Sequence, residues 1–301
     1  IVMLGGHSNI IGGTTAAKRN VVSGEGFAGI GLTGSTFGNI VKGNYVGVDP
    51  SGGGTTFGNT GPGILLATSA TVNFIGGTEI GAENVIAFNT AQGVSLLNTA
   101  AAGNRIMKNS IHDNGSLGID INADGITAND SDDPDGGPNG QQNFPILTNA
   151  EAFFAGLKVI GSLNSTPNTA FRVEFYSSAS CDPSGNGEGR TFVGTFDVTT
   201  NASGDYSFTQ TVTGVAVAAG EVITATAIRR SAPYDTSEFS ACRTATALTG
   251  VTDFTVTNAN DSGTGSLRQA IINANANPDL SQIKFNISGG GVKTITPATA
   301  F

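Results

Sequence analysis

The sequence predicts an all-β protein whose first half winds into a parallel β-solenoid. Asparagine recurs through residues 9–111 with a branched aliphatic residue two places after it. The segment Asn-Ile-Ile-Gly-Gly-Thr at 9–14 returns almost unchanged as Asn-Phe-Ile-Gly-Gly-Thr at 73–78. Glycine, at 44 of 301 residues, is about twice as frequent as usual. Frequent corners, short strands and a fixed repeat are together typical of a coil of stacked strands.

Each of these asparagines is expected to mark a corner of the coil. Asparagine tolerates the left-handed backbone region better than most residues, so it turns the chain at little steric cost. The aliphatic residue two places on is then expected to point inward from a short strand. Eight pairs follow this rule: Asn9/Ile11, Asn20/Val22, Asn39/Val41, Asn44/Val46, Asn73/Ile75, Asn84/Ile86, Asn104/Ile106 and Asn109/Ile111.

Further repeats have the same or nearly the same spacing. Arg-Asn-Val-Val-Ser at 19–23 returns as Glu-Asn-Val-Ile-Ala at 83–87. A glycine before an aliphatic-x-aliphatic element occurs at 29, 63, 93 and 118, and the interval from one to the next predicts the length of a single turn. Each long repeat then contains two or three turns, with a longer loop near 49–59. The alternative is a glycine-rich sandwich with chance repetition, and the phased matches argue against it.

Composition restricts the classes of partner. The net charge is −9, and the 14 Lys and Arg residues form no cluster beyond Arg229-Arg230, so a nucleic-acid partner is not expected. No apolar run reaches the length of a membrane span, and no signal peptide opens the chain. Ile1 falls within the repeat pattern, so we expect the natural N-terminus to lie elsewhere. Charged residues are only 12%, which suits stacked strands with polar uncharged surfaces.

The pattern changes near residue 149, where alternating strands replace the asparagine repeat. Period-two alternation between turn residues predicts a β-sandwich over 149–248, with a hairpin turn at 201–205. The expected strands are 157–161, 171–176, 191–198, 206–209, 222–227 and 239–242. Cys181 and Cys242 both fall here; they are either two buried thiols or, as we expect for an extracellular protein, a disulfide. If the module binds carbohydrate, Tyr176, Tyr206 and Tyr234 are the candidate platforms.

The last segment predicts a strand, a short helix and further strands. Residues 253–258 read as a strand, and Ser266 is a good N-cap for a helix over 267–275 with Gln269 as its capping-box partner. The apolar face of that helix is formed by Leu267, Ala270, Ile271 and Ala274. Pro278 is expected to end it, and strands are predicted at 282–287 and 292–296.

Parts of the chain resemble known proteins. Asn-Ser-Ile-His-Asp-Asn at 109–114, Leu-Gly-Ile-Asp-Ile at 117–121 and Gly-Pro-Asn-Gly-Gln-Gln-Asn-Phe-Pro-Ile-Leu-Thr at 137–148 carry the resemblance. They are similar to the closing coils of right-handed parallel β-helices of the pectin-lyase-like kind, and more closely to large secreted bacterial proteins that join such coils to immunoglobulin-like modules. In those proteins a strand and a Gly-Ser-Leu-Arg-Gln-Ala-Ile helix, like residues 265–271 here, plug the first turn.

The resemblance implies three parts. Residues 1–148 are expected to form right-handed parallel β-helix coils, residues 149–248 an Ig-like β-sandwich, and residues 249–301 the N-terminal cap and first strands of another β-helix. The chain thus ends with the opening of a coil and begins with coils that close one. Either the sequence is a window on a longer repetitive chain, or the Val292–Phe301 end of one copy stacks on the Ile1–Ile11 end of the next to build a head-to-tail fibre.

The acidic residues concentrate in one loop. Asp120-x-Asn122-x-Asp124-Gly125 matches half of a calcium loop, but Ser131 stands where a glutamate ligand is needed. The candidate calcium ligands are Asp120, Asn122, Asp124, Asp130, Asp132, Asp133 and Asp135. The alternative, which we favour, is an acidic solvated loop in which Asp and Asn make turns. Arg105 and Lys108 are expected to neutralise it.

No catalytic constellation stands out. The two histidines, His7 and His112, pair with no nucleophile in a recognised arrangement, and both are expected to be exposed at corners. We therefore expect a non-enzymatic extracellular structural or adhesive protein, with itself and surface glycans as partners. The alternative is a polysaccharide lyase or hydrolase, or a carbohydrate-binding module, of the pectin-lyase-like fold.

Overall fold

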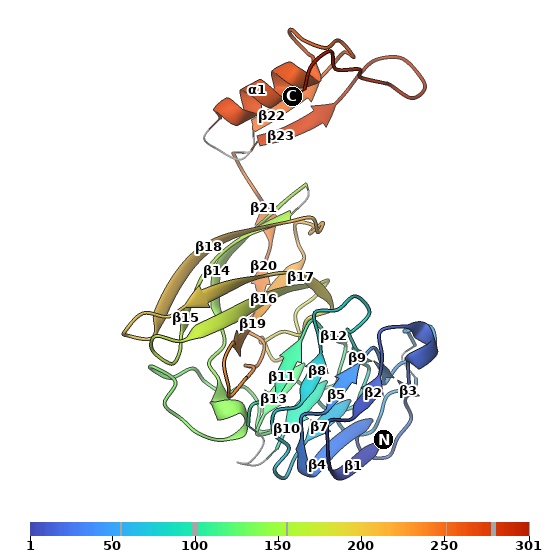
Figure 1. Cartoon of the computed structure of the whole chain (residues 1–301), viewed down its shortest axis with the longest axis vertical. Helices are drawn as coiled ribbons and strands as arrows, with labels where there is room; N and C mark the ends of the chain where they lie inside the picture. Colours follow the sequence, from blue (N-terminus) through green and yellow to red (C-terminus); the bar gives the residue numbers. More distant parts are fainter. Residues whose placement is uncertain (55, 98–101, 155, 251, 278–280, 301) are drawn as a thin grey trace. The chain divides into compact units, whose positions relative to one another are not determined.

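The computed structural model describes residues 1–301 except 55, 98–101, 155, 251, 278–280 and 301. The fold is mostly strand, and the described residues contain one α-helix. The chain divides into two compact units, Ile1–Thr246 and Ala247–Phe301. The first unit contains a coil of parallel strands and, packed on its last turn, two antiparallel sheets that we call the antiparallel module (Figure 1).

Three parallel sheets form the coil, and each turn contributes one short strand to each sheet. The first sheet has the order β1 (Val2–His7), β4 (Ile30–Phe37), β7 (Ile64–Leu66), β10 (Val94–Leu96) and β13 (Ile119–Ile121). The second has β2 (Ile10–Gly12), β5 (Ile40–Lys42), β8 (Phe74–Gly76) and β11 (Arg105–Met107). The third has β3 (Val21–Val22), β6 (Tyr45–Val46), β9 (Val85–Ala87) and β12 (Ser110–His112). A 3₁₀ turn, η1 (Ala16–Lys18), lies between β2 and β3.

The register confirms the expected turns. Ile30 pairs with Ile64, Ile64 with Val94, and Val94 with Ile119, so each glycine-led element starts one turn above the last. In the second sheet β2 pairs with β5 and β5 with β8, so the repeat that joins 9–14 to 73–78 covers two turns. Stacked parallel sheets of this kind fit a β-helix.

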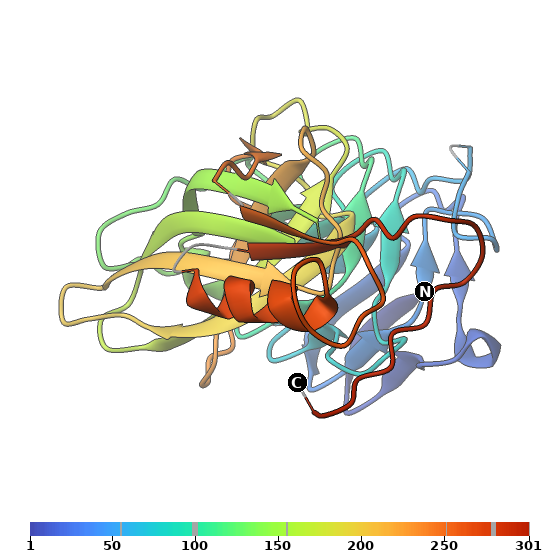
Figure 2. The ribbon, with the colours of Figure 1, turned by 90° about the horizontal axis from the view of Figure 1, so that it is seen from above.

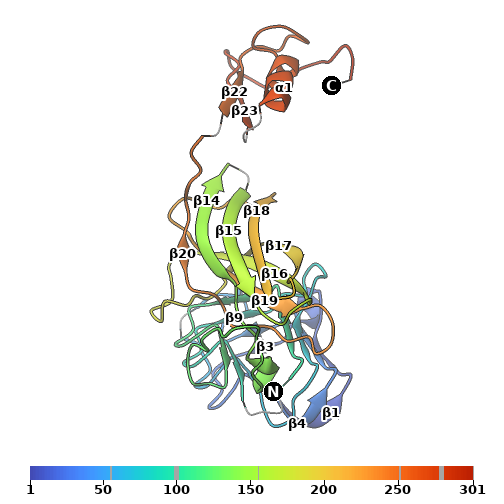
Figure 3. The same ribbon diagram turned by 90° about the vertical axis from the view of Figure 1, so that its left-hand side faces the viewer.

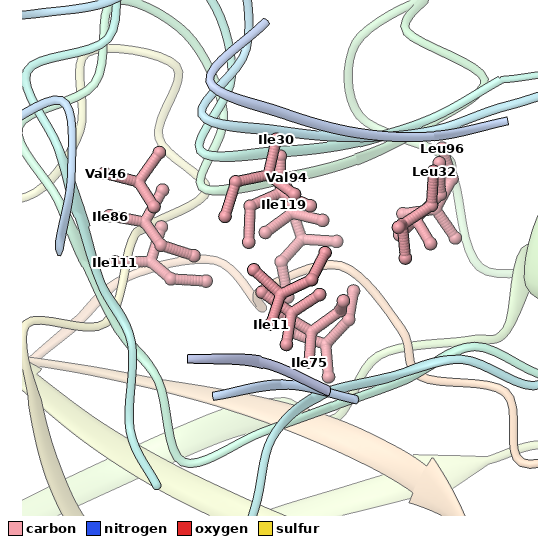
Figure 4. Packing of buried hydrophobic residues seen from close by; sticks show 14 of the residues in the cluster. Ile11, Ile30, Leu32, Val46, Ile75, Ile86, Val94, Leu96, Ile111 and Ile119 are labelled. Carbon is pink, nitrogen blue, oxygen red and sulfur yellow. The ribbon is translucent and has the colours of Figure 1, made fainter. Parts of the chain in front are cut away.

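The aliphatic residues of the repeat fill the interior of the coil in rows, in which side chains of successive turns stack on one another (Figure 4). The rows are Ile11/Val41/Ile75/Ile106, Val22/Val46/Ile86/Ile111 and Ile30/Ile64/Val94/Ile119. All of them are at most 9% exposed. The prediction that the second residue after each asparagine points inward is confirmed at all eight positions. Burial of these rows is the main favourable term in the stability of the coil.

The asparagines stack, but they do not turn the corners as the sequence suggested. The residue with a positive φ is often the one before the asparagine. This holds for Ser8, Gly38, Val72 and Gly103, and also for Gly43, Lys108, Phe88 and Asp113. None of the asparagines in the eight pairs has a positive φ. Their side chains instead form hydrogen-bonded ladders, which is why this residue recurs.

Each ladder follows one rule. The Nδ2 of Asn39 donates to Oδ1 of Asn73 at 2.9 Å, and the backbone N–H of Asn39 donates to the same oxygen at 3.1 Å. The first ladder is Asn9, Asn39, Asn73 and Asn104, and the second is Asn20, Asn44, Asn84 and Asn109. A third ladder contains Asn59, Asn89 and Asn114. The sequence pattern did not reveal it, because Gly61, Ala91 and Ser116 stand two places after these asparagines instead of branched aliphatic residues.

The antiparallel module has two four-stranded sheets around a shared core (Figure 3). One sheet has the order β18 (Asp205–Thr213), β15 (Gly156–Asn164), β14 (Ile146–Phe153) and β21 (Thr246–Ala247). The other has β17 (Thr191–Thr199), β16 (Ala170–Ser178), β19 (Val222–Arg229) and β20 (Arg243–Thr244). The turn η2 (Pro138–Gln141) precedes the module, and the hairpin turn at 201–205 forms as expected.

Two features of this module differ from, or add to, the sequence analysis. The strand expected at 239–242 is absent, because residues 235–240 spread over the end of the coil instead. The strand β14 was not expected. Cys181 and Cys242 form a disulfide, which ties the 181–190 loop to the segment that follows this crossing.

The second unit contains β22 (Thr252–Val256), α1 (Leu267–Ala276) and β23 (Ser281–Phe285). The two strands pair in parallel, and α1 packs against both of them (Figures 2 and 3). Ser266 caps α1 by accepting a hydrogen bond from the Gln269 backbone N–H at 3.2 Å. The reciprocal half of the capping box is absent, because the Ser266 backbone N–H donates to the Gly263 carbonyl at 3.1 Å, while the Gln269 side chain donates to Asn273.

The end of this unit departs from the prediction. Residues 292–296 form no strand, and Val292 is 98% exposed, because no paired strand lies beside that segment in the described part of the unit. The expected helix-ending Pro278 lies outside the described residues.

Candidate functional site at the two ends of the coil

The antiparallel module closes one end of the coil. Its Phe239 and Tyr176 belong to the core of the coil, and their rings meet edge to face with centroids 5.3 Å apart. Phe239 lies between two glycines: a Cβ on Gly118 of the coil would lie 2.9 Å from the ring, and one on Gly189 of the module 2.7 Å from it. Only glycine permits this close approach from both sides.

Carboxylates of the module accept the backbone N–H groups that the last turn leaves without a further strand. Glu188 accepts from Asn114, Glu174 from Lys108, Asp235 from Gly103, and Glu238 from Ile121 and Thr127. The donor–acceptor distances lie between 2.7 and 3.1 Å. A buried backbone N–H without a partner costs about 1–3 kcal/mol, so these contacts satisfy an edge that would otherwise be orphaned.

Glu188 continues the third ladder. Its Oε1 accepts from the Asn114 Nδ2 at 2.9 Å and from the Asn114 backbone N–H at 3.1 Å. Asn114 offers its own Oδ1 to Asn89 in the same two-donor pattern, at 2.9 and 3.2 Å. The glutamate therefore occupies the position that the next asparagine would take. Asn139 plays a similar part for the first ladder, since its Oδ1 accepts from the Asn104 backbone N–H at 2.9 Å.

Burial raises the pKa of these acids. It raises the pKa of Glu188 to about 7 and that of Glu238 to about 7, against the hydrogen bonds that favour the charged form. Burial also raises the pKa of Glu174 and of Asp235. In each case desolvation of the carboxylate outweighs the donors that it meets. We therefore expect the junction between coil and module to respond to pH.

We expect the first unit to lose stability as the pH rises from about 5 to about 8. The folded pKa of Glu188 and of Glu238 lies above the ordinary 4.5, so their contribution is fully present below pH 4.5 and is lost as pH rises through about 7. The full loss approaches about 3 kcal/mol per glutamate. Urea unfolding at a series of pH values measures it.

The variants Glu188→Gln and Glu238→Gln test whether these residues are the cause. Glutamine keeps an acceptor oxygen but does not titrate, so each variant should flatten the pH dependence. Glu25→Gln is the matched control, because Glu25 is exposed and its side chain forms no hydrogen bond in the described structure. Equal pH slopes for the wild type and both buried-site variants would contradict the assignment.

The opposite end of the coil is open. The strands β1, β2 and β3 each stand at the end of their sheet and pair on one side only. Large apolar side chains gather beside this edge, and seven of them are exposed: Ile1, Val2, Leu4, Ile10, Val21, Phe27 and Phe37. Exposed sheet edges and apolar patches both favour association with another chain.

The second unit is incompletely packed. Its buried described residues are Val256, Ser266 and Ala270. Phe285 of β23 is exposed, and β23 pairs with β22 alone. Two strands and one helix with so small a core need further packing for independent stability. Both the open end and this unit therefore present surface that a neighbour could bury.

The acidic loop does not bring all seven candidate calcium ligands together. The carboxylate oxygens of Asp130, Asp133 and Asp135 lie within 4.8 Å of one another. Asp133 already accepts from Ser165 Oγ at 2.6 Å and from the Asn143 backbone N–H at 3.1 Å. Burial raises the pKa of Asp133 to about 6. Asp133 thus links the loop to the module whether or not a cation binds.

The remaining candidate ligands lie apart from that trio. Asp120 is buried in β13, where its Oδ2 accepts from Gln92 at 3.0 Å. Asn122 and Asp124 contact each other in the turn that follows, with Asn122 Nδ2 at 3.5 Å from Asp124 Oδ2. The exposed Asp132 accepts no hydrogen bond in the described structure, and its backbone N–H donates to Asn164.

Several expectations about single residues are wrong. His112 is buried, not exposed: its ring packs edge to face against Phe88, and its Nδ1 lies 2.8 Å from Asp113 Oδ2. Burial lowers its pKa. His7 is exposed as expected and stacks on Phe37.

The basic residues and tyrosines also have other roles. Arg105 lies over the Tyr234 ring and Lys108 over the Phe192 ring, so neither neutralises the acidic loop. Tyr176 is buried, which removes it as a sugar platform. Tyr206 is half-buried and packs against the core of the module.

Comparison with known proteins leaves the site to be interpreted from its own geometry. No protein-family model matches the chain, and no curated protein matches it. Within the part of the chain that the structure describes, no helix combines the length and the apolar character needed to cross a bilayer.

Sequence reasoning missed the carboxylates that close the coil. Glu174, Glu188 and Glu238 come from three separate segments, and their partners are backbone N–H groups. Such partners leave no residue pattern in the sequence. The available signal was weak: an isolated glutamate next to apolar or glycine neighbours, as in Ser-Glu-Phe at 237–239.

Proposed function

We propose that the chain is an extracellular structural or adhesive protein, built to extend a rod by end-to-end stacking of coils. In this proposal the coil is a right-handed parallel β-helix, the antiparallel module is an Ig-like spacer, and the second unit is the opening cap of a further β-helix. The disulfide supports an oxidising, extracellular compartment.

The difference between the two ends of the coil carries the proposal. One end is closed by buried aromatic rings and carboxylates of the antiparallel module. The other presents three edge strands that pair on one side only, beside exposed apolar residues. Edge strands of this kind are templates for further main-chain pairing, so this face of the coil favours contact with another strand-bearing segment.

The occupant that we propose is the second unit of a neighbouring copy. Its parallel strand pair is the kind of edge that main-chain pairing extends, and its small buried core leaves apolar surface for that contact. Because the two contacting surfaces differ, the contact can repeat from one copy to the next, and it builds a fibre when the rotation between copies does not close a ring.

Sedimentation velocity and electron microscopy of the purified chain test the proposal. The wild type is expected to sediment as larger species with rising concentration and to form filaments. The double variant Ile10→Lys, Val21→Lys places two charges on the edge strands β2 and β3, and is expected to remain a monomer. Ile80→Lys, in an exposed loop, is the matched control and should assemble like the wild type.

Two outcomes would count against this function. One is a wild type that stays monomeric throughout the concentration series. The other is a double variant that is folded by circular dichroism and still forms filaments like those of the wild type.

A further inference from the structure

Four arginines converge where the coil meets the antiparallel module, although the chain has a net charge of −9. They come from separate segments: Arg105 from β11, Arg172 from β16, and Arg229 and Arg230 from the end of β19 and the residue after it. They line two adjoining cavities of about 430 and 120 Å³ that share Arg105, Met107 and Arg172. We call these cavities together the arginine groove.

Two aromatic rings lie close to the Arg105 guanidinium. The guanidinium carbon lies 4.0 Å from the centre of the Tyr234 ring and 5.6 Å from that of Phe74. The N–H groups of a guanidinium point outward in its own plane, so a ring against one face, such as Tyr234, leaves them free to donate. The Nε of Arg105 is buried and has no hydrogen-bond partner among the described residues.

The groove has more cationic than anionic groups. Asp197 pairs with both Arg172 and Arg230, so one carboxylate serves two guanidiniums. Lys42, which also lines the larger cavity, is paired with Glu79 at 2.6 Å. A buried, unmatched cation is costly, and an anion would relieve that cost.

The two remaining arginines have no carboxylate within ion-pair distance in the described structure, although the Asp235 carboxylate interacts electrostatically with Arg229. Within the described structure neither Arg105 nor Arg229 forms an ion pair, and the buried Nε of Arg229 has no hydrogen-bond partner either. Burial lowers the pKa of the Arg105 guanidinium, and repulsion from Arg172 and Arg230 lowers it further, against the attraction of Tyr234 and Glu174. Glu174 itself is held by Tyr176 and the Lys108 backbone N–H.

We propose that the arginine groove binds a small organic anion that joins a carboxylate, sulfate or phosphate group to a ring. A planar guanidinium donates two parallel hydrogen bonds to such an oxyanion, which gives both affinity and orientation. The larger cavity falls within the usual size of small-molecule sites, and its wall includes Ile40, Phe74 and Met107, against which a ring can pack. This inference is independent of the filament.

Isothermal titration calorimetry of the whole chain tests it with four probes. Phenyl phosphate and glucuronate each join an anion to a ring, inorganic phosphate is the anion alone, and glucose is a ring without charge. At least one ring-bearing anion is expected to bind about tenfold more tightly than inorganic phosphate, with affinity falling as salt is added. Whichever of phenyl phosphate and glucuronate binds more tightly shows whether the ligand carries an aromatic ring or a sugar ring. Absence of binding by every anion, or equal binding of glucose and glucuronate, would overturn the proposal.

Substitutions then locate the site. Arg105→Gln is expected to weaken binding of the preferred probe about tenfold or more, since charge-assisted hydrogen bonds are lost. Arg19→Gln is the matched control: Arg19 also lies over a tyrosine, 3.9 Å from the centre of the Tyr45 ring, but outside the groove, and should bind like the wild type. If Arg105→Gln fails to fold, the half-exposed Arg230→Gln serves in its place and should weaken binding and reduce its dependence on salt. Wild-type affinity in a folded groove variant would contradict the assignment.

Discussion

Replacing Asn73 by alanine is expected to lower the free energy of unfolding by about 3 kcal/mol or more. Asn73 is fully buried at the middle of the first ladder. Its Oδ1 accepts from the Asn39 side chain and backbone, and its Nδ2 donates to the Thr36 carbonyl at 3.3 Å. The substitution strands the Asn39 backbone N–H in a dry interior, which costs about 1–3 kcal/mol. It also removes the Asn73 donor to the Thr36 carbonyl, which still accepts from the Thr71 N–H.

The first ladder contains its own control. Asn9 stands at the open end, is exposed, and donates to Asn39 without being an acceptor in turn. Asn9→Ala should therefore cost under about 1 kcal/mol, because water replaces the lost partners. Urea unfolding followed by circular dichroism measures both variants. A similar decrease in the free energy of unfolding for both variants would show that burial does not determine how much each asparagine of the ladder contributes to stability.

Replacing Phe239 by alanine is expected to cost about 4 kcal/mol, the usual loss for a buried phenylalanine. Phe239 belongs to the antiparallel module in sequence but to the core of the coil in space. Its removal leaves a cavity between Gly118 and Gly189, which have no side chains to fill it. The coil and the module should then unfold as two separate transitions in calorimetry, whereas the wild type is expected to show one transition for the pair.

Phe154→Ala is the comparison for this prediction, since Phe154 is 81% exposed just after the end of β14. It should change the melting temperature little. A single sharp transition for Phe239→Ala, at the temperature of the wild type, would mean that the module does not stabilise the coil through this ring.

The stacking of the coil could be predicted because it rests on repetition. An inward side chain such as Ile75 must sit above another of similar shape, so the repeat appears directly in the sequence. The position of the corners could not be predicted in the same way. Left-handed residues are as varied as Ser8, Val72 and Lys108, because tertiary packing of the turns overrides local preference at these sites.

The closing contacts and the arginine groove were beyond the sequence for a different reason. Arg105 and Arg172 lie far apart along the chain, in different modules, and only the adjacent pair at 229–230 was visible as a basic feature. The segment 239–242 alternates like a strand, yet Phe239 leaves its own module to fill the end of the coil. Such contacts depend on how the modules dock, which local patterns do not encode.

The asparagine ladders also have a direction. Every hydrogen bond between two of their side chains runs from an Nδ2 to the Oδ1 of the next turn toward the closed end. At the start of the first two ladders, the Oδ1 of Asn9 and that of Asn20 accept no hydrogen bond in the described structure. A segment that binds at these two oxygens has to supply N–H donors. A second row of amide oxygens facing Asn9 and Asn20 would be repelled. The coil is therefore polar along its axis, and in the filament that we propose copies are expected to join through unlike ends.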